Sequence, residues 1–223
     1  MRAMPIGDVG EFKLIDALAQ LVAERRQGVV DRAGPGGFRV LLGIGDDAAA
    51  WDGQGGTTVL TTDTLVEGVH FRRPDISWMD LGWKSMAVNL SDIAAMGCMP
   101  TYSVITLGLK DDVPVDGLVE MYRGMFEACR QHGGAIVGGD VVRSPVFFVT
   151  VAMVGSLPAL EGGKTTKLLT RSSASPGDRI AVTGSLGCSG GGLRMLLHGL
   201  SFDDETAGHL RDAHNRPVPR VAQ

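Results

Sequence analysis

The sequence lacks an apolar run that approaches the roughly 20 residues needed to cross a bilayer as a helix. Its first residues, Met1 to Asp8, also lack the apolar stretch of a secretory signal peptide. No basic stripe is evident, and the net charge is -4, from 21 basic and 25 acidic residues. These absences argue against a membrane protein and against a nucleic-acid partner. We therefore expect a cytoplasmic protein that acts on small molecules.

Cysteine is also scarce, with Cys98, Cys129 and Cys188 far apart, odd in number and in no metal-ligand spacing. We interpret them as reduced structural thiols of a cytosolic protein. No Ser-His-Asp or Cys-His constellation stands out either. What the chain does have is an ordinary globular composition over 223 residues, with 44% hydrophobic residues. That length suits one large or two small domains with a real core.

Five aspartates are the most informative feature, because we expect them where loops leave strands or at the end of a helical stripe. Glycine and hydroxyl residues surround them, and 32 glycines in the chain favour tight turns and close approach to a ligand. If the carboxylates converge, they repel one another, and divalent cations are the usual remedy. Magnesium, the foremost such cation, usually accompanies substrate phosphates. The five are Asp46, Asp47, Asp63, Asp92 and Asp140.

Asp92 offers the clearest geometric test. At about 100° per residue, Ser85, Asn89 and Asp92 share one narrow stripe of a helix expected from Asp80 to Met96. The alternative is an ordinary solvated face, but the stripe holds no Lys or Glu. A buried polar stripe needs partners, so the pattern favours a functional surface.

The other acidic motifs are weaker when taken singly. Asp47, after two glycines, and Asp63, flanked by Thr61, Thr62 and Thr64, would each more often be turn residues. The threonine hydroxyls can also ligate a cation or bond a phosphate. His70 follows closely; a lone histidine is more often structural or exposed, but this one could donate to a substrate phosphate.

Periodicity predicts a helix at 8–27, strands at 38–44, 57–63, 102–109, 135–140 and 146–155, helices at 80–96 and 115–132, a strand at 179–184 and a helix at 193–197. Asp80 is a plausible N-cap and Gly97 the stop of the second helix. The sequence Gly163-Lys-Thr-Thr suggests a phosphate loop, but Pro158 stands where that motif requires glycine. The glycine-rich residues 184–192 are a better phosphate cradle, with a flexible linker as the alternative.

Taken in order, the motifs resemble those of the thiamine-monophosphate kinase family, within the aminoimidazole-ribonucleotide-synthetase-like superfamily. They cover nearly the whole chain and are specific together, although each is weak alone. The motifs are Gly10-Glu-Phe-Lys-Leu-Ile, Gly43-Ile-Gly-Asp-Asp-Ala-Ala, Thr61-Thr-Asp-Thr-Leu-Val-Glu-Gly-Val-His-Phe, residues 82–97, Gly138-Gly-Asp, Leu169-Thr-Arg-Ser, Pro176-Gly-Asp and Val182-Thr-Gly.

The resemblance implies ATP-dependent, magnesium-dependent phosphorylation of thiamine monophosphate to thiamine diphosphate by a transferase of thiamine biosynthesis. It also implies a cytoplasmic homodimer that pairs through its N-terminal sheets. Asp63 and Arg171 would be catalytic, and His70 would contact the substrate. The implied metal positions are Asp47, Thr61, Thr62, Asp63, Asp92 and Asp140, and the implied nucleotide contacts are Tyr122, Gly139, Asp140 and Arg171. Asp46 would shape the turn.

The implied fold is α/β (α+β) with two domains: residues 1–156 bind ATP and magnesium and dimerise, 157–174 form a linker, and 175–223 begin an incomplete second α/β domain. Family members continue with a further Ser-Asp-Gly motif and substrate-binding residues that are not in this sequence. Two alternatives stay open. One is another ATP-dependent enzyme of the superfamily, and the other is a non-catalytic nucleotide-binding or dimerisation module.

Overall fold

A computed structural model describes residues 39–53, 56–158 and 167–221, together with residues 13, 15, 16, 19 and 20. The last five are helical, and the rest of the helix predicted at 8–27 lies outside the described residues, as does Lys164. Within this described part of the chain, no helix combines the length and the apolar character required to cross a bilayer.

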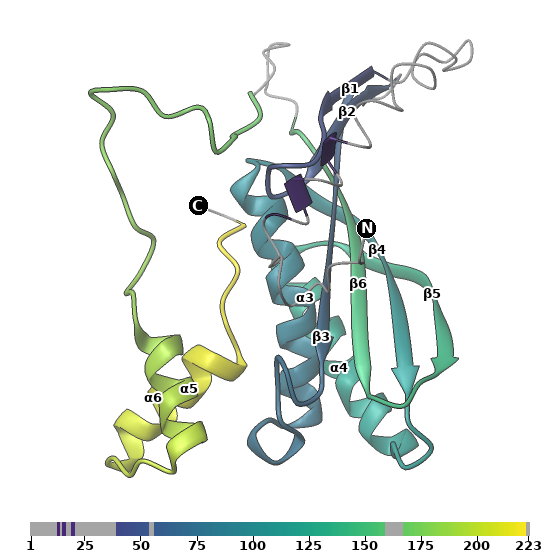
Figure 1. Cartoon of the computed structure of the whole chain (residues 1–223), viewed down its shortest axis with the longest axis vertical. Coiled ribbons are helices and arrows are strands. Elements are labelled where there is room, and N and C mark those ends of the chain that lie inside the picture. Colours follow the sequence, from purple (N-terminus) through teal and green to yellow (C-terminus); the bar gives the residue numbers. More distant parts are fainter. Residues whose placement is uncertain are drawn as a thin grey trace, which may run out of the picture.

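A six-stranded mixed sheet forms the centre of the molecule, in the order β1-β2-β3-β6-β4-β5 (Figure 1). Only β4 and β5 pair in parallel, and the other neighbours are antiparallel. The strands are β1 (Arg39–Leu42), β2 (Ala49–Gly53), β3 (Gly56–Val66), β4 (Met99–Leu109), β5 (Ala135–Arg143) and β6 (Phe148–Ser156).

Two long helices, α3 (Trp78–Ala95) and α4 (Val115–His132), cover one face of this sheet (Figure 1). Side chains alternate along β6, so that Val149, Val151 and Met153 are buried beneath the helices and form the core with their counterparts on β3 and β4. The opposite face carries no helix among the described residues, and apolar side chains on it remain exposed. The mixed α/β sheet predicted from the sequence is thus confirmed.

The two helices approach each other closely because glycine stands at both contact points. A Cβ on Gly82 would overlap the carbonyl oxygen of Met121, and a Cβ on Gly124 would overlap that of Met79. Each backbone therefore packs directly against the other. This close contact fixes α3, the helix that carries Asp92.

The predicted limits of α3 and α4 agree well with the structure, apart from one cap, whereas the helix predicted at 193–197 is longer and begins at Cys188. The helix predicted at 115–132 is confirmed, and Gly97 follows α3 with a φ of +71°, which favours glycine. The predicted N-cap Asp80 is wrong. Ser77 caps α3 by accepting a hydrogen bond from the Asp80 backbone N–H, and its own hydroxyl donates to the Asp80 carboxylate (2.7 Å).

The sequence predicted Asp63 and Asp140 at the ends of strands, where loops begin, and this prediction is wrong. β3 continues to Val66 and β5 continues to Arg143, so both aspartates are inside strands. The reason is tertiary pairing. Asp63 is opposite Val151 of β6, and Asp140 is opposite Thr106 of β4. The strand β2 was not predicted at all.

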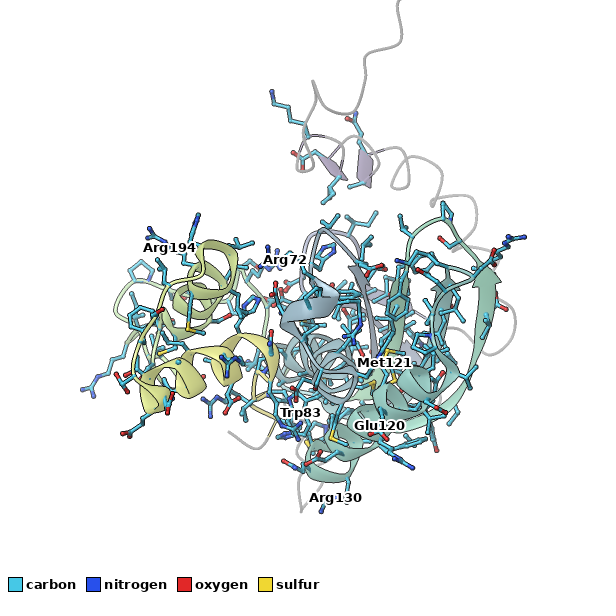
Figure 2. All side chains as sticks on the ribbon, turned by 90° about the horizontal axis from the view of Figure 1, so that it is seen from below. Arg72, Trp83, Glu120, Met121, Arg130 and Arg194 are labelled. Atoms are coloured by element: carbon cyan, nitrogen blue, oxygen red, sulfur yellow. The ribbon has the colours of Figure 1, made fainter. Side chains whose placement is uncertain are left out.

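The C-terminal part contains a pair of helices, α5 (Cys188–His198) and α6 (Asp204–Asn215), set against the α3 side of the sheet and its two helices (Figure 2). Arg72 and Trp83 lie at this junction, whereas Arg194 points away from it. The Arg72 guanidinium donates to the Leu196 carbonyl (2.8 Å). α6 was not predicted, and polar contacts rather than a shared core hold the pair in place.

The strand predicted in the C-terminal part is wrong. Residues 179–184 form no strand, because they have no strand neighbour among the described residues, and Ile180 is 98% exposed. The glycine-rich residues 184–192, predicted as a phosphate cradle, are only partly a loop. α5 already begins at Cys188, and a Cβ on Gly192 would overlap the Leu210 carbonyl, so this glycine serves the contact between α5 and α6.

Candidate active site

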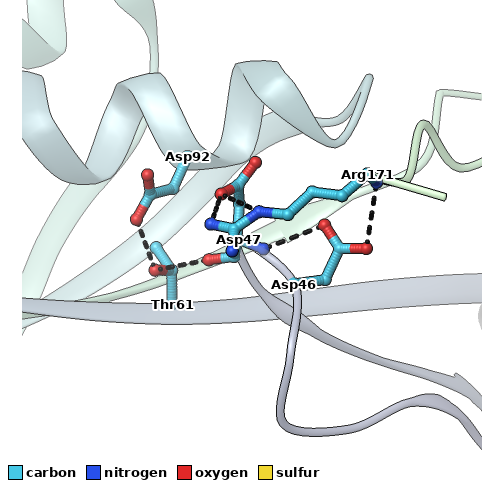
Figure 3. Close-up of polar contacts among 5 residues, drawn as sticks. All are labelled: Asp46, Asp47, Thr61, Asp92 and Arg171. Atoms are coloured by element: carbon cyan, nitrogen blue, oxygen red, sulfur yellow. Dashed lines mark hydrogen bonds and ion pairs between the residues drawn. The ribbon is translucent and has the colours of Figure 1, made fainter. Parts of the chain in front are cut away.

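The acidic motifs meet where the turn after β1 approaches β3 and α3. Thr61, buried on β3, donates its hydroxyl proton to Asp92 Oδ2 (2.8 Å), and its Oγ1 lies 3.1 Å from the Asp47 carbonyl oxygen (Figure 3). One threonine thus links a strand, a helix and a loop. Asp46 Oδ1 accepts the Asp47 backbone N–H (3.0 Å), which suits the turn-shaping role expected of Asp46.

Arg171 joins this cluster from a distant part of the sequence. Its guanidinium forms an ion pair with the Asp47 carboxylate, and Nε donates to Asp47 Oδ1 at 3.0 Å (Figure 3). Its backbone N–H donates to Asp46 Oδ2 (3.2 Å). The Arg171 guanidinium is therefore paired with the Asp47 carboxylate, which the family resemblance implies as a metal ligand.

Arg171 reaches the cluster because the preceding residues are anchored to the body. The Leu169 N–H donates to the Met96 carbonyl at the end of α3 (3.2 Å), and Leu168 packs against the core. The Leu169 side chain would also contact a Cβ on Gly97. The sequence offers no periodic signal for this docking.

Asp63 lies on the same face of β3 as Thr61, two residues along the strand. The Asn89 side-chain oxygen accepts its backbone N–H (3.1 Å), and Asn89 Nδ2 donates to the Ser85 carbonyl (3.0 Å). Ser85 and Asn89 of the polar stripe are therefore buried and partnered, as its composition indicated, and Asp92 is half-buried. Its first two residues support the site and the third, Asp92, enters it.

Burial and mutual repulsion govern the charges of the cluster. Burial raises the pKa of Asp63, and the nearby His70 opposes that rise. Burial also raises the pKa of Asp92; Asp63 and Asp47 add to this, while the Thr61 hydrogen bond and Arg171 oppose it. These carboxylates therefore repel one another, and they would gain from a bound cation.

A cavity of about 350 Å³ opens beside the two carboxylates. One part of its wall comes from α3 and another from a stretch that follows α6, which the sequence analysis had not connected with the site. Its lining residues are Asp63, Ala87, Val88, Ser91, Asp92, Pro217, Val218 and Pro219.

His70 lies in the loop after β3, close enough to Asp63 to affect its charge. Its Nδ1 accepts the Val66 backbone N–H (3.1 Å). In the neutral ring, the proton is then on Nε2, which can donate to a ligand. A second cavity, of about 190 Å³, separates this loop from α5 and α6 and includes His70, Arg72 and His214 in its wall.

The structure does not bring the remaining predicted residues to this cluster. Thr62 and Asp140 lie on the sheet face away from the helices, where the Thr62 hydroxyl donates to the Val151 carbonyl (3.0 Å). Gly139 faces the other way, and a Cβ there would overlap the Ile105 carbonyl. Tyr122 packs on α4 against the core, and burial raises its pKa.

Among the described residues, no three His, Cys, Asp or Glu side chains are grouped closely enough to hold a metal ion by themselves. The donor chemistry nevertheless suits magnesium. Asp63, Asp92 and Thr61 offer carboxylate and hydroxyl oxygens, the hard ligands that magnesium takes, and magnesium also uses water and phosphate oxygens.

Comparison with known proteins explains this arrangement. The sequence profile described as AIR synthase related protein, N-terminal domain, matches residues 45–157, about half of the chain. The chain belongs to the AIR synthase related family. The match spans β2 to the end of β6 and includes every predicted site residue except Arg171.

Within this family, the chain is similar to thiamine-monophosphate kinases, which confirms the resemblance seen in the sequence. It is 40% identical over 216 residues to that of Escherichia coli K12, and 36% identical over 187 residues to that of Bacillus subtilis. These matches cover 96% and 82% of this chain but only 60% and 56% of the relatives. The chain thus spans under two thirds of the length of these relatives.

A solved structure named AaThiL complexed with AMPPCP and TMP has the same architecture. It superposes with a TM-score of 0.81 at 31% sequence identity, and the match covers 99% of this chain and 63% of that one. Since nearly the whole of this chain is covered, the AIR synthase related fold extends to the C-terminal helices α5 and α6.

Proposed function

We propose that this chain takes part in the transfer of the ATP γ-phosphoryl group to thiamine monophosphate, which gives thiamine diphosphate. One observation carries the proposal: Asp47, Thr61, Asp92 and Arg171 form a single polar network, with Asp63 beside it. The relatives named above support the substrate, as does the structure with AMPPCP, an ATP analogue, and TMP.

The residues of the site suit phosphoryl transfer, which depends on positioning and on charge neutralisation. Asp63 and Asp92, with Asp47 once Arg171 has left it, would hold magnesium. The chemistry that bound magnesium would supply there is neutralisation of the phosphate charge. The Arg171 guanidinium supplies a further positive charge at the rim. His70 Nε2 is free to donate to a phosphate oxygen of the acceptor.

No general base is required of these residues, because the acceptor is a phosphate oxygen that is already ionised near neutral pH. The residues of the site then have to align the two phosphate groups and offset the electrostatic repulsion between them. The Arg171 side chain is 63% exposed, so a ligand at the rim of the site could reach its guanidinium.

We further propose a cytoplasmic homodimer that pairs through the uncovered sheet face. Leu60 of β3, Met99 and Val104 of β4, and Val142 of β5 are each about 40% exposed there. A second copy would cover these apolar side chains. Thr62 and Asp140 lie on this face, so pairing would place them at the interface. A Val104→Lys variant is expected to sediment as a monomer.

We also propose that residues 1–156 form the nucleotide-binding and dimerisation unit, 157–174 the linker, and 175–223 the beginning of the second domain. The sheet ends at Ser156, and no described residue of α5 or α6 belongs to the core cluster or packs against it. This division agrees with the end of the family match at residue 157.

The decisive experiment measures phosphoryl transfer from ATP to thiamine monophosphate by this 223-residue chain, with and without magnesium. Asp63→Asn should abolish turnover without unfolding the protein, and Asp112→Asn, in an exposed loop, should leave it unchanged. Turnover by Asp63→Asn at ordinary magnesium would refute the assignment. Stabilisation by ATP without any turnover would favour a nucleotide-binding module instead, and preference for another acceptor would favour a different enzyme of the superfamily.

A further inference from the structure

Residues 216–221, which we call the C-terminal strap, run from the end of α6 across α3 to the acidic cavity. Pro217, Val218 and Pro219 line the same cavity as Asp63 and Asp92. The strap is therefore part of the wall that faces any ligand held by these carboxylates. The position of the strap therefore determines how large the cavity is and how much water it admits.

A single arginine at the start of the strap holds it to both helices. The Arg216 guanidinium donates to Asp80 Oδ1 on α3 (3.1 Å) and pairs with Glu127 Oε2 on α4 (2.7 Å). It also lies over the Trp83 ring, 4.2 Å from the ring centroid. Trp83 Nε1 donates in turn to the Pro217 carbonyl (2.7 Å). Figure 2 shows Trp83 at the boundary between α3 and the C-terminal part.

The contacts on either side of this group do not replace it. Asn215, almost fully buried, donates to the Asp75 carbonyl (2.7 Å), which holds the end of α6 but not the strap. At the far end, Val221 packs against the core. Between these two points, the described hydrogen bonds and ion pairs that bind the strap to the body are those of Arg216 and Trp83. Pro219, further along the strap, is also buried.

We propose that Arg216 is a positioning residue: it holds the strap as a wall of the acidic cavity and so sets the affinity of the site for magnesium and nucleotide. This inference rests on the proposed function. A guanidinium suits the task better than an ammonium, because its planar fork serves two carboxylates while its face packs on an indole.

The same contacts indicate that loss of Arg216 leaves the fold intact. Asp80 and Glu127 are each about 30% exposed, and partly solvated ion pairs contribute little to stability. Arg216 lies outside the hydrophobic core cluster. Substitution should therefore loosen the strap rather than unfold the body.

The test compares Arg216→Gln and Arg216→Lys with Arg123→Gln, which removes an exposed ion pair to Glu120 on α4. Amide hydrogen exchange over residues 216–221 reports the strap, and steady-state kinetics with ATP varied at saturating magnesium report the site. Arg216→Gln should speed exchange and raise the KM for ATP about tenfold, with kcat changed less than about twofold. Arg216→Lys should recover part of the KM, and Arg123→Gln should change nothing.

Unchanged amide exchange in Arg216→Gln would show that Arg216 does not hold the strap. Faster exchange with an unchanged KM would show that the strap does not affect nucleotide binding. If Arg216→Gln fails to fold, Trp83→Phe leaves a smaller aromatic face beneath Arg216 and removes the indole N–H that donates to the Pro217 carbonyl, with the same expected direction. If the unaltered chain shows no turnover, the kinase proposal fails by itself. Calorimetric binding of magnesium-ATP then tests the strap, and binding equally tight in Arg216→Gln would refute it.

Discussion

The sheet with its two long helices, residues 39–158, and the C-terminal part, residues 167–221, are built in different ways. The first has a continuous apolar core, with helices in backbone contact through glycine. The second exposes most of its side chains and buries only one large apolar residue, Met195. The site draws on both parts. Thr61, Asp63 and Asp92 come from rigid elements, whereas Arg171 and the strap come from the loosely packed part.

This contrast suggests a division of labour. The carboxylates that must be held against their own repulsion lie on a strand and a helix that cannot move apart easily. The groups that must meet and release nucleotide, Arg171 and the strap, are attached by a few polar contacts. Loop-borne functional groups on a rigid scaffold are a common arrangement.

The largest effect is expected from a substitution at the contact between α3 and α4, which should remove the close packing that distinguishes the body from the C-terminal part. Gly82→Ala places a methyl group against the Met121 carbonyl and should destabilise the protein by about 3 kcal/mol, the upper range for overpacking. For a chain of this size, that corresponds to a fall in Tm of roughly 6–12 °C. Thermal unfolding followed by circular dichroism measures it.

Gly208→Ala is the matched control in the C-terminal part. Gly208 is in α6, and a Cβ there meets nothing within 4 Å. Alanine should raise stability there by up to about 1 kcal/mol, because it favours the helix. Equal effects of the two substitutions would show that the two parts are packed alike.

Arg171→Gln should separate metal binding from catalysis. Removal of the guanidinium frees Asp47 and leaves more negative charge beside Asp92, so magnesium should bind several-fold more tightly in the absence of nucleotide. Phosphoryl transfer should fall by roughly 100-fold, because a positive charge at the reacting phosphate is lost. Calorimetry and turnover assays give the two numbers. Arg179→Gln, exposed in the same segment, is the control, and weaker magnesium binding in Arg171→Gln would contradict the prediction.

The smallest effect concerns pH. The pKa of Asp92 is raised in the folded protein, so its charged form is disfavoured there relative to the unfolded chain. The stability that this group contributes is complete below its unfolded pKa of about 3.9 and is lost as pH rises through the higher folded value. Asp92→Asn should therefore raise the Tm of the metal-free protein at pH 7.

That gain should shrink as pH falls toward about 4, where aspartate itself begins to be protonated. Added magnesium should reverse the order, because only the carboxylate gains from the cation. Melting curves at several pH values, with Asp112→Asn alongside, measure the effect. A gain that is the same at every pH would point to a steric cause instead.

The sequence predicted the body well, because periodicity and local stop signals decide it. The limits of α4, the end of α3 at Gly97 and the buried stripe of Ser85 and Asn89 all followed from spacing. The convergence of Asp47, Asp63 and Asp92 agrees with the expectation that the aspartates meet, whereas Asp140 lies on the opposite face of the sheet. Each of these signals is local, and the core then agrees with it.

Where contacts between distant segments decide, prediction failed. Residues 179–184 have strand-like alternation but no described partner, and a strand needs one. α6 is too polar for a periodic signal, although Asp203, whose side chain accepts the Thr206 N–H, marks its start. The prolines of the strap favour an extended chain, but its position depends on Trp83 and Arg216 meeting across more than 100 residues of chain.

The bond from Leu169 to the end of α3 makes the location of Arg171 independent of what precedes it. Leu168 and Leu169 are fixed to the body, so only one residue, Thr170, lies between this anchor and Arg171. The stretch from residue 159 to 166 can therefore differ in length among relatives while the guanidinium keeps its place. One residue inserted after Leu169 would displace the guanidinium from Asp47. The length of the chain is therefore constrained between Leu169 and Arg171 and not over the whole linker.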